Sequence, residues 1–361
     1  MEGRDIDAKL SRDDVKQLVD AELSSIYQDL KAKAGPIDAD FKTLIGAMDD
    51  FVARGGKRIR PYLVYLGYFG LNRSNNDDII KIAAALELLH NFLLIHDDII
   101  DRDYERYHGP NVGGIYYDKF SQEHSDEEAL HLANSVALLA GDINHLLTNK
   151  VILDSQFEDA EKLAVMKLIS DKTFEVIGGE FLDLAVSVGG DLNPSEGQLL
   201  NVAQYKTASY SFECPLVAGA LLAKAGEREV EGLSSFARPA GIAYQLQDDM
   251  LGVFGDPDAT GKPITSDLSE GKQTLLIHYG LEQGSQKHIE TIKQVHGRQN
   301  LKESDVEAVK SVLEESGAAD VVRSQIKSYS QEALQSIPAS MEPEVKQELE
   351  ATIANLVERT Y

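Results

Sequence analysis

Residues 87–101 read ELLHNFLLIHDDIID, an apolar helical segment that closes on three aspartates. On an α-helix, side chains three or four positions apart share a face, so Asp101 neighbours both Asp97 and Asp98. We therefore expect the three carboxylates to converge. Such a cluster repels itself and is costly to desolvate unless a cation neutralises it. Carboxylate oxygens suit Mg²⁺, which fills its remaining positions with water and with phosphate oxygens of a substrate.

A second acidic pair, Asp248 and Asp249, closes another apolar run, GIAYQLQ at residues 241–247. Asp and Glu supply 60 of the 361 residues, so either cluster alone has an ordinary explanation as surface charge. Two apolar helices that each end in carboxylates instead indicate two walls of one cavity. Such walls could hold several Mg²⁺ ions and one polyphosphate.

The composition and the first residues exclude several classes of protein. The formal net charge of −25 argues against nucleic acid and anionic membranes as partners, because both reward clusters of Lys and Arg. Cys214 is the only cysteine, which leaves no disulfide within the chain and fits a reducing cytoplasm. The start, MEGRDIDAKLSRDDVK, lacks the apolar core of a signal peptide, and no run of about 18 uncharged apolar residues indicates a transmembrane helix. We expect a soluble cytoplasmic protein.

The apolar residues recur with helical spacing along nearly the whole chain, and no stretch alternates for long enough to predict a sheet. Ser11, followed by acids, is an expected N-cap for a helix that Gly35 and Pro36 end. Helices are predicted at about 12–33, 38–53, 58–71, 77–104, 126–150, 158–187, 195–213, 215–225, 228–255, 273–284, 302–316, 319–336 and 342–359. The sequence therefore predicts an all-α bundle, with one domain over residues 1–361 and outer helices at about 300–361.

Three further patterns carry cations that could bind an anion. GGKRIRP at 55–61 offers flexible backbone and three cations at the start of a helix, which suits a diphosphate, although a solvated turn has the same composition. Lys206 in YKT is a cation in an apolar helix, where the alternative is a lysine that reaches solvent. The third pattern is a glycine-bounded loop at 260–272 that contains Lys262, Asp267 and Lys272.

Taken together and in this order, the motifs resemble those of the trans-isoprenyl diphosphate synthases, the polyprenyl synthetase family that includes farnesyl and geranylgeranyl diphosphate synthases. The resemblance covers about residues 40–290. The matching segments are GGKRIRP for the family's GGKRxRP, ELLHNFLLIHDDIID for its first aspartate-rich motif, GGEFLDL (178–184) for GQxxDL, YKTASY for its KT motif, and YQLQDDMLGVFGDPDATGKPITSDLSEGK for its second aspartate-rich region with the lysine loop. The resemblance implies an all-α bundle around a deep central cavity, usually a homodimer, that joins isopentenyl diphosphate to an allylic diphosphate.

Carried over position by position, the resemblance also implies residue roles. Three Mg²⁺ per active site would be held by Asp97, Asp98, Asp101, Asp248 and Asp249, with a further contact from Asp267. Arg106, Lys206 and Lys262 would bind the allylic diphosphate, with Thr207, Gln245 and Lys272 as further substrate contacts. Isopentenyl diphosphate would contact Gly56, Lys57, Arg60 and His90. Mg²⁺, Lys and Arg would stabilise the charge that develops on the leaving diphosphate, so no protein nucleophile is needed.

The chain departs from the family pattern at several positions. Gly252 stands where the second motif has its third acid, and Glu180 stands where the family has Gln. After Arg106 the family's second arginine is Tyr107, with His108 next. Arg359, near the C-terminus, is a weak match to a contact of the homoallylic diphosphate.

The expected product length depends on the helix wall before the aspartates. Phe92 lies five residues before Asp97, about 7.5 Å back along the helix axis, and would stop a growing chain there, with Leu93 and Leu89 beside it. Ordinary core packing is the alternative explanation for this ring. In the resembling family, an aromatic residue here without an insertion in the motif resembles the geranylgeranyl-producing type, and farnesyl or longer-chain polyprenyl diphosphates are the alternative products.

Two other classes fit part of the pattern. A non-catalytic subunit of a heteromeric prenyl synthase would have lost metal-binding acids, and only Gly252 points that way. A class I terpene cyclase would need an Asn/Ser/Glu triad where this chain has Asp248 and Asp249, and it would not need GGKRIRP.

Overall fold

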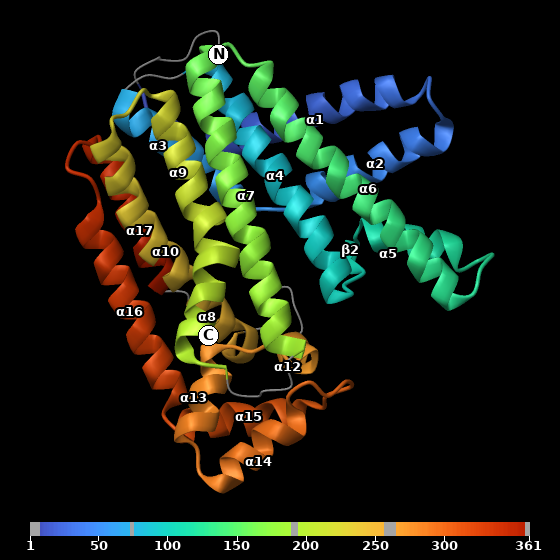
Figure 1. Cartoon of the computed structure of the whole chain (residues 1–361), viewed down its shortest axis with the longest axis vertical. Helices are drawn as coiled ribbons and strands as arrows, with labels where there is room; N and C mark the ends of the chain where they lie inside the picture. The colour runs from blue at the N-terminus through green and yellow to red at the C-terminus, as the bar shows by residue number, and fades with distance from the viewer. Residues whose placement is uncertain (1–7, 73–75, 189–193, 256–264, 358–361) are drawn as a thin grey trace. The chain divides into compact units, whose positions relative to one another are not determined.

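The computed structural model describes residues 8–72, 76–188, 194–255 and 265–357 (Figure 1). By its internal contacts the chain forms two compact units. Unit 1 comprises Met1–Met166 and Leu221–Ala223, and unit 2 comprises Lys167–Ala220 and Lys224–Tyr361. The predicted single domain, and the cavity at its centre, stay predictions.

Unit 1 is built around one buried helix, α4 (Asp77–Asp101). Its other helices are α1 (Arg12–Ala34), α2 (Ala39–Arg54), α3 (Ile59–Asn72), α5 (Val112–Phe120) and α6 (Asp126–Leu153). α4 packs against α1, α3 and α6, and lies beside α6 in Figure 1. Ser11 caps α1 in a reciprocal capping box with Asp14, as its sequence predicts.

The C-terminal end of α4 differs from its prediction. The helix ends at Asp101 rather than at 104, because Arg102 adopts the left-handed conformation (φ 60°) and stops it. Two short antiparallel strands follow, β1 (Glu105–Arg106) and β2 (Gly109–Pro110), and Asn111 then caps α5. The periodicity did not indicate this hairpin, because each strand has only two residues.

The length and composition of α4 would also suit a membrane-spanning helix. Its most apolar window has a mean hydropathy of 1.5, although Lys81 and Glu87 interrupt the apolar run. Within the part of the chain that the structure describes, it is the one helix that meets this test, and 72% of the window is buried. Such burial is typical of the central helix of a soluble protein.

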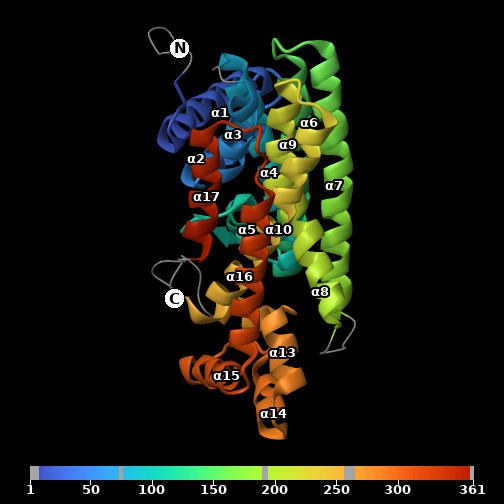
Figure 2. The same ribbon diagram turned by 90° about the vertical axis from the view of Figure 1, so that its left-hand side faces the viewer.

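Unit 2 is built around α10 (Glu227–Phe254), which packs against η1, α16 and α17 (Figure 2). η1 (Ala203–Glu213) is a π-helix. The other elements are α8 (Glu196–Val202), α12 (Thr265–Glu270), α13 (Leu275–Gln283), α14 (Gln286–Val295), α15 (Glu303–Glu315), α16 (Ala318–Ser336) and α17 (Pro343–Val357). α7 (Asp159–Val188) begins in unit 1 and continues into unit 2. α9 (Cys214–Leu222) belongs to unit 2 except for its last two residues, which belong to unit 1.

The all-α fold is confirmed, and each predicted helix is present among the described residues. The prediction at 195–213 was wrong in kind, because this stretch is α8 followed by the π-helix η1. α5, α12 and α14 were not predicted. α5 carries two glycines near its start and α12 has six residues, so neither has a strong apolar period. α14 does have one, but in a short helix of ten mostly polar residues.

The backbones of α7 and η1 touch at Gly179. A Cβ atom added to Gly179 would lie 2.3 Å from the backbone nitrogen of Lys206, so only glycine fits this contact. π-helical turns are often found at functional sites, because the extra residue displaces a side chain from its usual direction. The contact therefore fixes where η1 presents Lys206.

We expect Gly179→Ala to destabilise the protein by about 1–3 kcal/mol, since backbone atoms must move to admit the methyl group. Gly197→Ala, in α8, is the matched control, because nothing lies within 4 Å of the added methyl group. This change should be neutral or stabilising by up to about 1 kcal/mol, through helix propensity alone. Urea denaturation of both variants measures the difference, and equal stabilities would contradict the close contact.

Candidate active site

The three aspartates of the first motif do not act as one cluster. Asp97 and Asp101, one helical turn apart, bring carboxylate oxygens within 4.8 Å of each other. Asp98 is 4% exposed and its two oxygens are held by other groups of unit 1. The expected convergence is therefore wrong for Asp98. Asp98 lies only about 60° from Asp101 around the helix. The hydrogen bonds to its two oxygens, rather than the helix geometry, therefore separate it from the pair of Asp97 and Asp101.

Asp98 is held by a cation and an amide. Arg106, on β1, places Nη2 at 2.5 Å and Nε at 2.7 Å from Asp98 Oδ1, and Asn111 Nδ2 donates to Oδ2 at 2.8 Å. Burial raises the pKa of the Asp98 carboxyl to about 6, against the opposing charge of Arg106. Arg106 Nη2 also lies 3.8 Å from Asp97 Oδ2, so the guanidinium contacts the first acidic motif at two of its aspartates.

The three cations of the GGKRIRP segment differ in burial, and only one of them is in the core. Arg58 is 5% exposed, with Nη1 at 2.6 Å from Glu87 Oε1 and Nε at 2.8 Å from Asp20 Oδ1. Because Glu87 begins the apolar stretch that ends in the aspartates, this buried ion pair ties the two motifs together. Lys57 is exposed and Arg60 partly exposed, so these two remain candidates for contact with a ligand.

Glycine is required at Gly55 and at Gly56 for different reasons. Gly56 has φ +94°, which L-residues rarely adopt. A Cβ atom on Gly55 would lie 2.2 Å from the ring of Tyr107, which also packs on Phe51 with ring centroids 5.8 Å apart. Tyr107, which replaces the family's second arginine, is therefore a packing residue that fills the space above Gly55.

His90 is a neutral histidine among arginines. It is 9% exposed, and its pKa is lowered well below the usual value by burial and by the charges of Arg60, Arg106 and Arg58. The imidazole therefore stays uncharged while these cations surround it. A group of guanidinium ions near one buried polar ring is a favourable place for an anion.

The residues expected to set product length differ in how far they are exposed on α4. The Phe92 ring is 9% exposed and packs between His96 and His145 of α6, with centroid distances of 4.7 and 4.9 Å. Leu89 is buried, whereas Leu93, one turn before Asp97 on the same face, is partly exposed. The assignment of Phe92 as the stopper stays a prediction.

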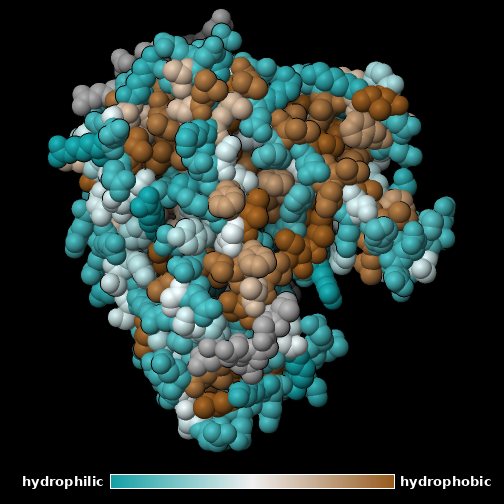
Figure 3. Space-filling model, in the orientation of Figure 1, coloured by the Kyte–Doolittle hydropathy of each residue, from teal (hydrophilic) through white to brown (hydrophobic). Residues whose placement is uncertain are grey.

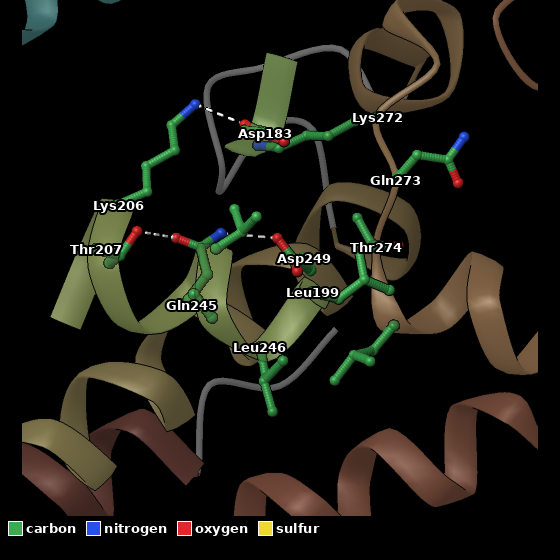
Figure 4. A pocket seen from close by; sticks show the side chains of 13 residues that line it. Asp183, Leu199, Lys206, Thr207, Gln245, Leu246, Asp249, Lys272, Gln273 and Thr274 are labelled. Atoms are coloured by element: carbon green, nitrogen blue, oxygen red, sulfur yellow. Dashed lines mark hydrogen bonds and ion pairs between the residues drawn. The ribbon is translucent and has the colours of Figure 1, made fainter. Parts of the chain in front are cut away.

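In unit 2, Lys206 lies between two carboxylates. Its Nζ is 2.8 Å from Asp183 Oδ2 and 2.9 Å from Glu180 Oε2, both on α7. The Lys206 side chain is therefore held by ion pairs rather than extended into solvent, and Figure 4 shows the one with Asp183. Glu180, which stands where the family has Gln, adds the second of these charges.

A hydrogen-bond chain joins the KT motif to the second acidic motif. Thr207 Oγ1 donates to Gln245 Oε1 at 2.6 Å, and Gln245 Nε2 donates to Asp249 Oδ1 at 2.7 Å. Figure 4 shows these side chains around a pocket that Lys272 also lines. The pocket has about 40 Å³ of free space, enough for a few water molecules or a hydrated ion but not for a prenyl chain.

The remaining predicted residues are scattered or undescribed. Asp248 is exposed on α10, and Gly252 lies one turn further along the same helix. Asp267 belongs to α12, and its side chain is outside what the structure describes. Lys262 and Arg359 also lie outside the described residues.

Two residues of these sites were not predicted. Asp183 stands in the quoted GGEFLDL segment, and its spacing of three from Glu180 already placed both acids on one helix face. Asn111 precedes Val-Gly-Gly, and the two glycines concealed the helix that it caps. An asparagine directly after proline, at the start of an unrecognised helix, was the signal that could have found it.

We expect Arg58→Met to lower the free energy of unfolding by about 3–5 kcal/mol, because Glu87 would stay buried without its cation. Lys57→Met, at the neighbouring exposed position, should change it by less than about 0.5 kcal/mol. Urea denaturation measures both. Similar losses in the two variants would show that Arg58 does not carry the structural role.

Comparison with known proteins gives a consistent identity. The sequence profile of the polyprenyl synthetase family matches residues 41–314. The short chain isoprenyl diphosphate synthase of Methanocaldococcus jannaschii is 31% identical over 81% of this chain and 82% of that protein. The geranylfarnesyl diphosphate synthase of Aeropyrum pernix is 31% identical over 88% of this chain and 94% of that protein.

Solved structures agree. A geranylgeranyl pyrophosphate synthase from Corynebacterium glutamicum, in complex with isoprenyl diphosphate and magnesium, superposes with a TM-score of 0.90 and 28% identity, over 97% of this chain and all of that one. The chain belongs to the polyprenyl synthetase family and is a prenyltransferase of the short-chain isoprenyl diphosphate synthase type.

Proposed function

We propose that the protein is a Mg²⁺-dependent synthase that condenses isopentenyl diphosphate with an allylic diphosphate and makes mainly geranylgeranyl diphosphate. One observation carries the proposal. At the end of α4, the carboxylate pair of Asp97 and Asp101 stands beside a guanidinium, that of Arg106, which Asp98 holds in place. Carboxylates that suit a metal and a fixed cation that suits a phosphate are thus adjacent.

The residues present fit Mg²⁺. Asp97 and Asp101 offer hard oxygen donors within 4.8 Å of each other, and opposite positions of an octahedral Mg²⁺ site are roughly 4 Å apart. Small side-chain rotations would therefore let both bind one ion. We assign the same role to Asp248 and Asp249 of α10, with three ions in all. When bound, Mg²⁺ would neutralise the charge that develops on the leaving diphosphate.

The protein's own residues bind and orient the substrates. Arg106 and Lys206 would contact the allylic diphosphate, and their ion pairs hold both cations before the substrate arrives. Gly56, Lys57, Arg60 and the neutral His90 would receive isopentenyl diphosphate. Lys262, Lys272 and Thr207 are assigned as further substrate contacts, and Gln245 as the link between Thr207 and Asp249.

The transfer needs no covalent protein intermediate. The allylic C–O bond breaks, the double bond of isopentenyl diphosphate attacks the allylic carbon, and a proton is lost to the departing diphosphate. Cys214 is fully buried, and burial raises the pKa of its thiol to about 12, so it does not supply a thiolate nucleophile.

Two other functions lead to different products. A terpene cyclase would release a cyclic hydrocarbon without using isopentenyl diphosphate, and a non-catalytic subunit would release nothing. The test is to incubate the purified chain with Mg²⁺, isopentenyl diphosphate and a series of allylic diphosphates, and to separate the products by chromatography. Linear prenyl diphosphates support the proposal, and their absence with every allylic substrate would overturn it.

We expect Asp97→Ala and Asp101→Ala each to lower kcat by several orders of magnitude, because each removes a ligand that positions leaving-group stabilisation. Both variants should stay folded, since losing one acid of the pair relieves repulsion. Turnover at saturating substrates measures the effect, with circular dichroism as the folding control. Near-normal turnover of Asp101→Ala would remove the metal assignment.

The product assignment rests on Phe92. Its ring closes the space between α4 and α6 one turn and a half before Asp97. A similar solved structure is a geranylgeranyl synthase, whereas a similar curated protein makes geranylfarnesyl diphosphate, one isoprene unit longer. The product length therefore varies among relatives at comparable identity, and it has to follow from particular residues such as this ring.

We expect Phe92→Ala to lengthen the products, at a cost of about 3–5 kcal/mol in stability because the ring is buried. Leu93→Ala, on the face of Asp97, is the matched comparison and should shift the products less. Reversed-phase chromatography of the dephosphorylated products measures both. A folded, active Phe92→Ala enzyme with unchanged products would show that another residue sets the length.

We also propose a homodimer, formed by α7. Four large apolar side chains follow one face of this helix within unit 2, and their spacing of three, four and three residues makes a continuous stripe. They are Phe174 (81% exposed), Ile177 (56%), Phe181 (69%) and Leu184 (39%). Figure 3 shows hydrophobic surface along α7. A stripe of this length on one helix is typical of a face that a second copy covers.

We expect Phe181→Glu to convert the dimer to a monomer in sedimentation velocity, because it would place a charge in the middle of the covered stripe. Ile37→Glu is the control, since Ile37 is 72% exposed in the turn after α1 and lies on neither helix face. It should leave the dimer intact. A monomeric wild-type protein at micromolar concentration would contradict the proposal.

We also propose that the protein is cytoplasmic. The single cysteine and the burial of α4 support it. Cell fractionation tests it, and recovery in a salt-washed membrane pellet would count against it.

A further inference from the structure

Asn111 is a buried residue whose side chain and backbone meet four different parts of unit 1. It is 1% exposed and lies where β2 passes into α5. Its Oδ1 accepts from the backbone nitrogen of Gly114 at 2.8 Å, which caps α5. Its Nδ2 donates to the carbonyl oxygen of Asp103 at 2.7 Å and to Asp98 Oδ2 at 2.8 Å, and its backbone nitrogen donates to the carbonyl oxygen of Tyr104 at 3.0 Å.

The cap alone does not require asparagine. Ser, Thr and Asp accept from the same backbone nitrogen equally well, and Ser is the N-cap of α1, α6 and α8. An asparagine differs from these residues by its two N–H donors. In Asn111 both donors are used, one of them on a carboxylate of the first aspartate motif.

The carboxylate that Asn111 contacts holds Arg106 in turn. Asp98 Oδ2 is taken by Asn111, which leaves Oδ1 to receive both Nε and Nη2 of Arg106. The amide therefore fixes the rotation of the carboxylate about its Cβ–Cγ bond. That rotation decides where the guanidinium stands relative to Asp97, whose Oδ2 lies 3.8 Å from Arg106 Nη2.

We propose that Asn111 is a positioning residue for diphosphate binding, which acts through Asp98 to hold Arg106 beside Asp97. The inference rests on the proposed function for the role of Arg106. Without the Nδ2 donor, the buried Asp98 carboxylate can turn, and Arg106 loses its fixed direction. A charge-assisted hydrogen bond of this kind is worth a factor of about ten in binding when it is lost.

The test is Asn111→Ser, which keeps an acceptor for the cap of α5 and removes the donor to Asp98. We expect the KM of the allylic diphosphate to rise about tenfold, with the KM of isopentenyl diphosphate changed less than about twofold. The Kd of inorganic pyrophosphate with Mg²⁺, from calorimetry, should rise by the same factor as the allylic KM. Asn76→Ser is the matched control, because Asn76 caps α4 by accepting from Asp78 N at 2.8 Å. It should leave the kinetic constants unchanged.

A double-mutant cycle separates positioning from a structural role. If Asn111 acts through Asp98, Asn111→Ser should cost less than about threefold in an Asp98→Asn background, where Arg106 is no longer held. Costs that multiply in the double mutant would overturn the relay through Asp98. An Asn111→Ser protein with a lower unfolding temperature but unchanged KM and pyrophosphate Kd would assign Asn111 to the fold alone.

The proposed function and the role of Asn111 can fail independently of each other. If the wild-type chain makes no prenyl diphosphate, the proposed function fails, and the relay is then judged on pyrophosphate binding. If Asn111→Ser does not fold, Asn111→Thr replaces it, because threonine is closer in size to asparagine, also caps a helix and lacks the amide donor. Wild-type pyrophosphate affinity in that variant would overturn the relay.

Discussion

The ion pair of Asp98 with Arg106 determines how charge is arranged at the end of α4. A carboxylate that is 4% exposed cannot stay ionised without a partner, and Arg106 with Asn111 supplies it. Because both oxygens of Asp98 are bound by Arg106 and Asn111, Asp97 and Asp101 form a pair without it. One motif of three like charges is therefore divided into a pair of carboxylates, Asp97 and Asp101, and a third carboxylate, Asp98, that holds a cation. The division follows from the partners of Asp98, because its position on the helix alone would leave it beside Asp101.

Buried charge imposes the same constraint elsewhere in the chain. Arg58 is neutralised by Glu87 and Asp20, which joins the glycine-rich segment to the start of the apolar stretch. Glu213, at the end of η1, is 3% exposed and pairs with Lys172 and Arg238. These pairs lower the pKa of the Glu213 carboxyl despite the burial that opposes them. The π-helix that carries Lys206 is thus anchored at its far end by a charge network of its own.

The helices were predictable because their apolar period is long and regular. α4 presents buried residues on more than one face and α6 presents a continuous buried stripe on one face, and both helices begin at a capping residue, Asn76 or Ser125, followed by acids. The hairpin at 105–110 and α5 were not predictable, because two-residue strands and a glycine-rich first turn have no period. The same limit applied to the site. The sequence indicated that Asp97, Asp98 and Asp101 act together, but the partner that separates Asp98 from them lies beyond the hairpin.

The residue types in a motif also did not predict where each side chain points. Arg58, Lys57 and Arg60 look equivalent in GGKRIRP, yet the left-handed conformation of Arg58 (φ 49°) turns one of them into the core. Tyr107 looked like a lost arginine, and it fills the space above Gly55 instead. The direction of Arg58 depends on backbone conformation, and the role of Tyr107 depends on packing against a segment about 50 residues away. Neither can be inferred from a short stretch of sequence.

The surroundings of Lys206 show what a single replacement can do to a binding site. One positive and two negative charges, on Lys206, Glu180 and Asp183, leave this cluster with a net charge of −1. An amide in place of Glu180 would leave it neutral. A phosphate that approaches Lys206 without a cation therefore meets repulsion from the carboxylates as well as attraction from the amine. A phosphate that arrives with a divalent cation brings the charge that the carboxylates require, so the two bind more readily together than either does alone. The charges around Lys206 therefore support its proposed role, the binding of an allylic diphosphate that arrives together with Mg²⁺.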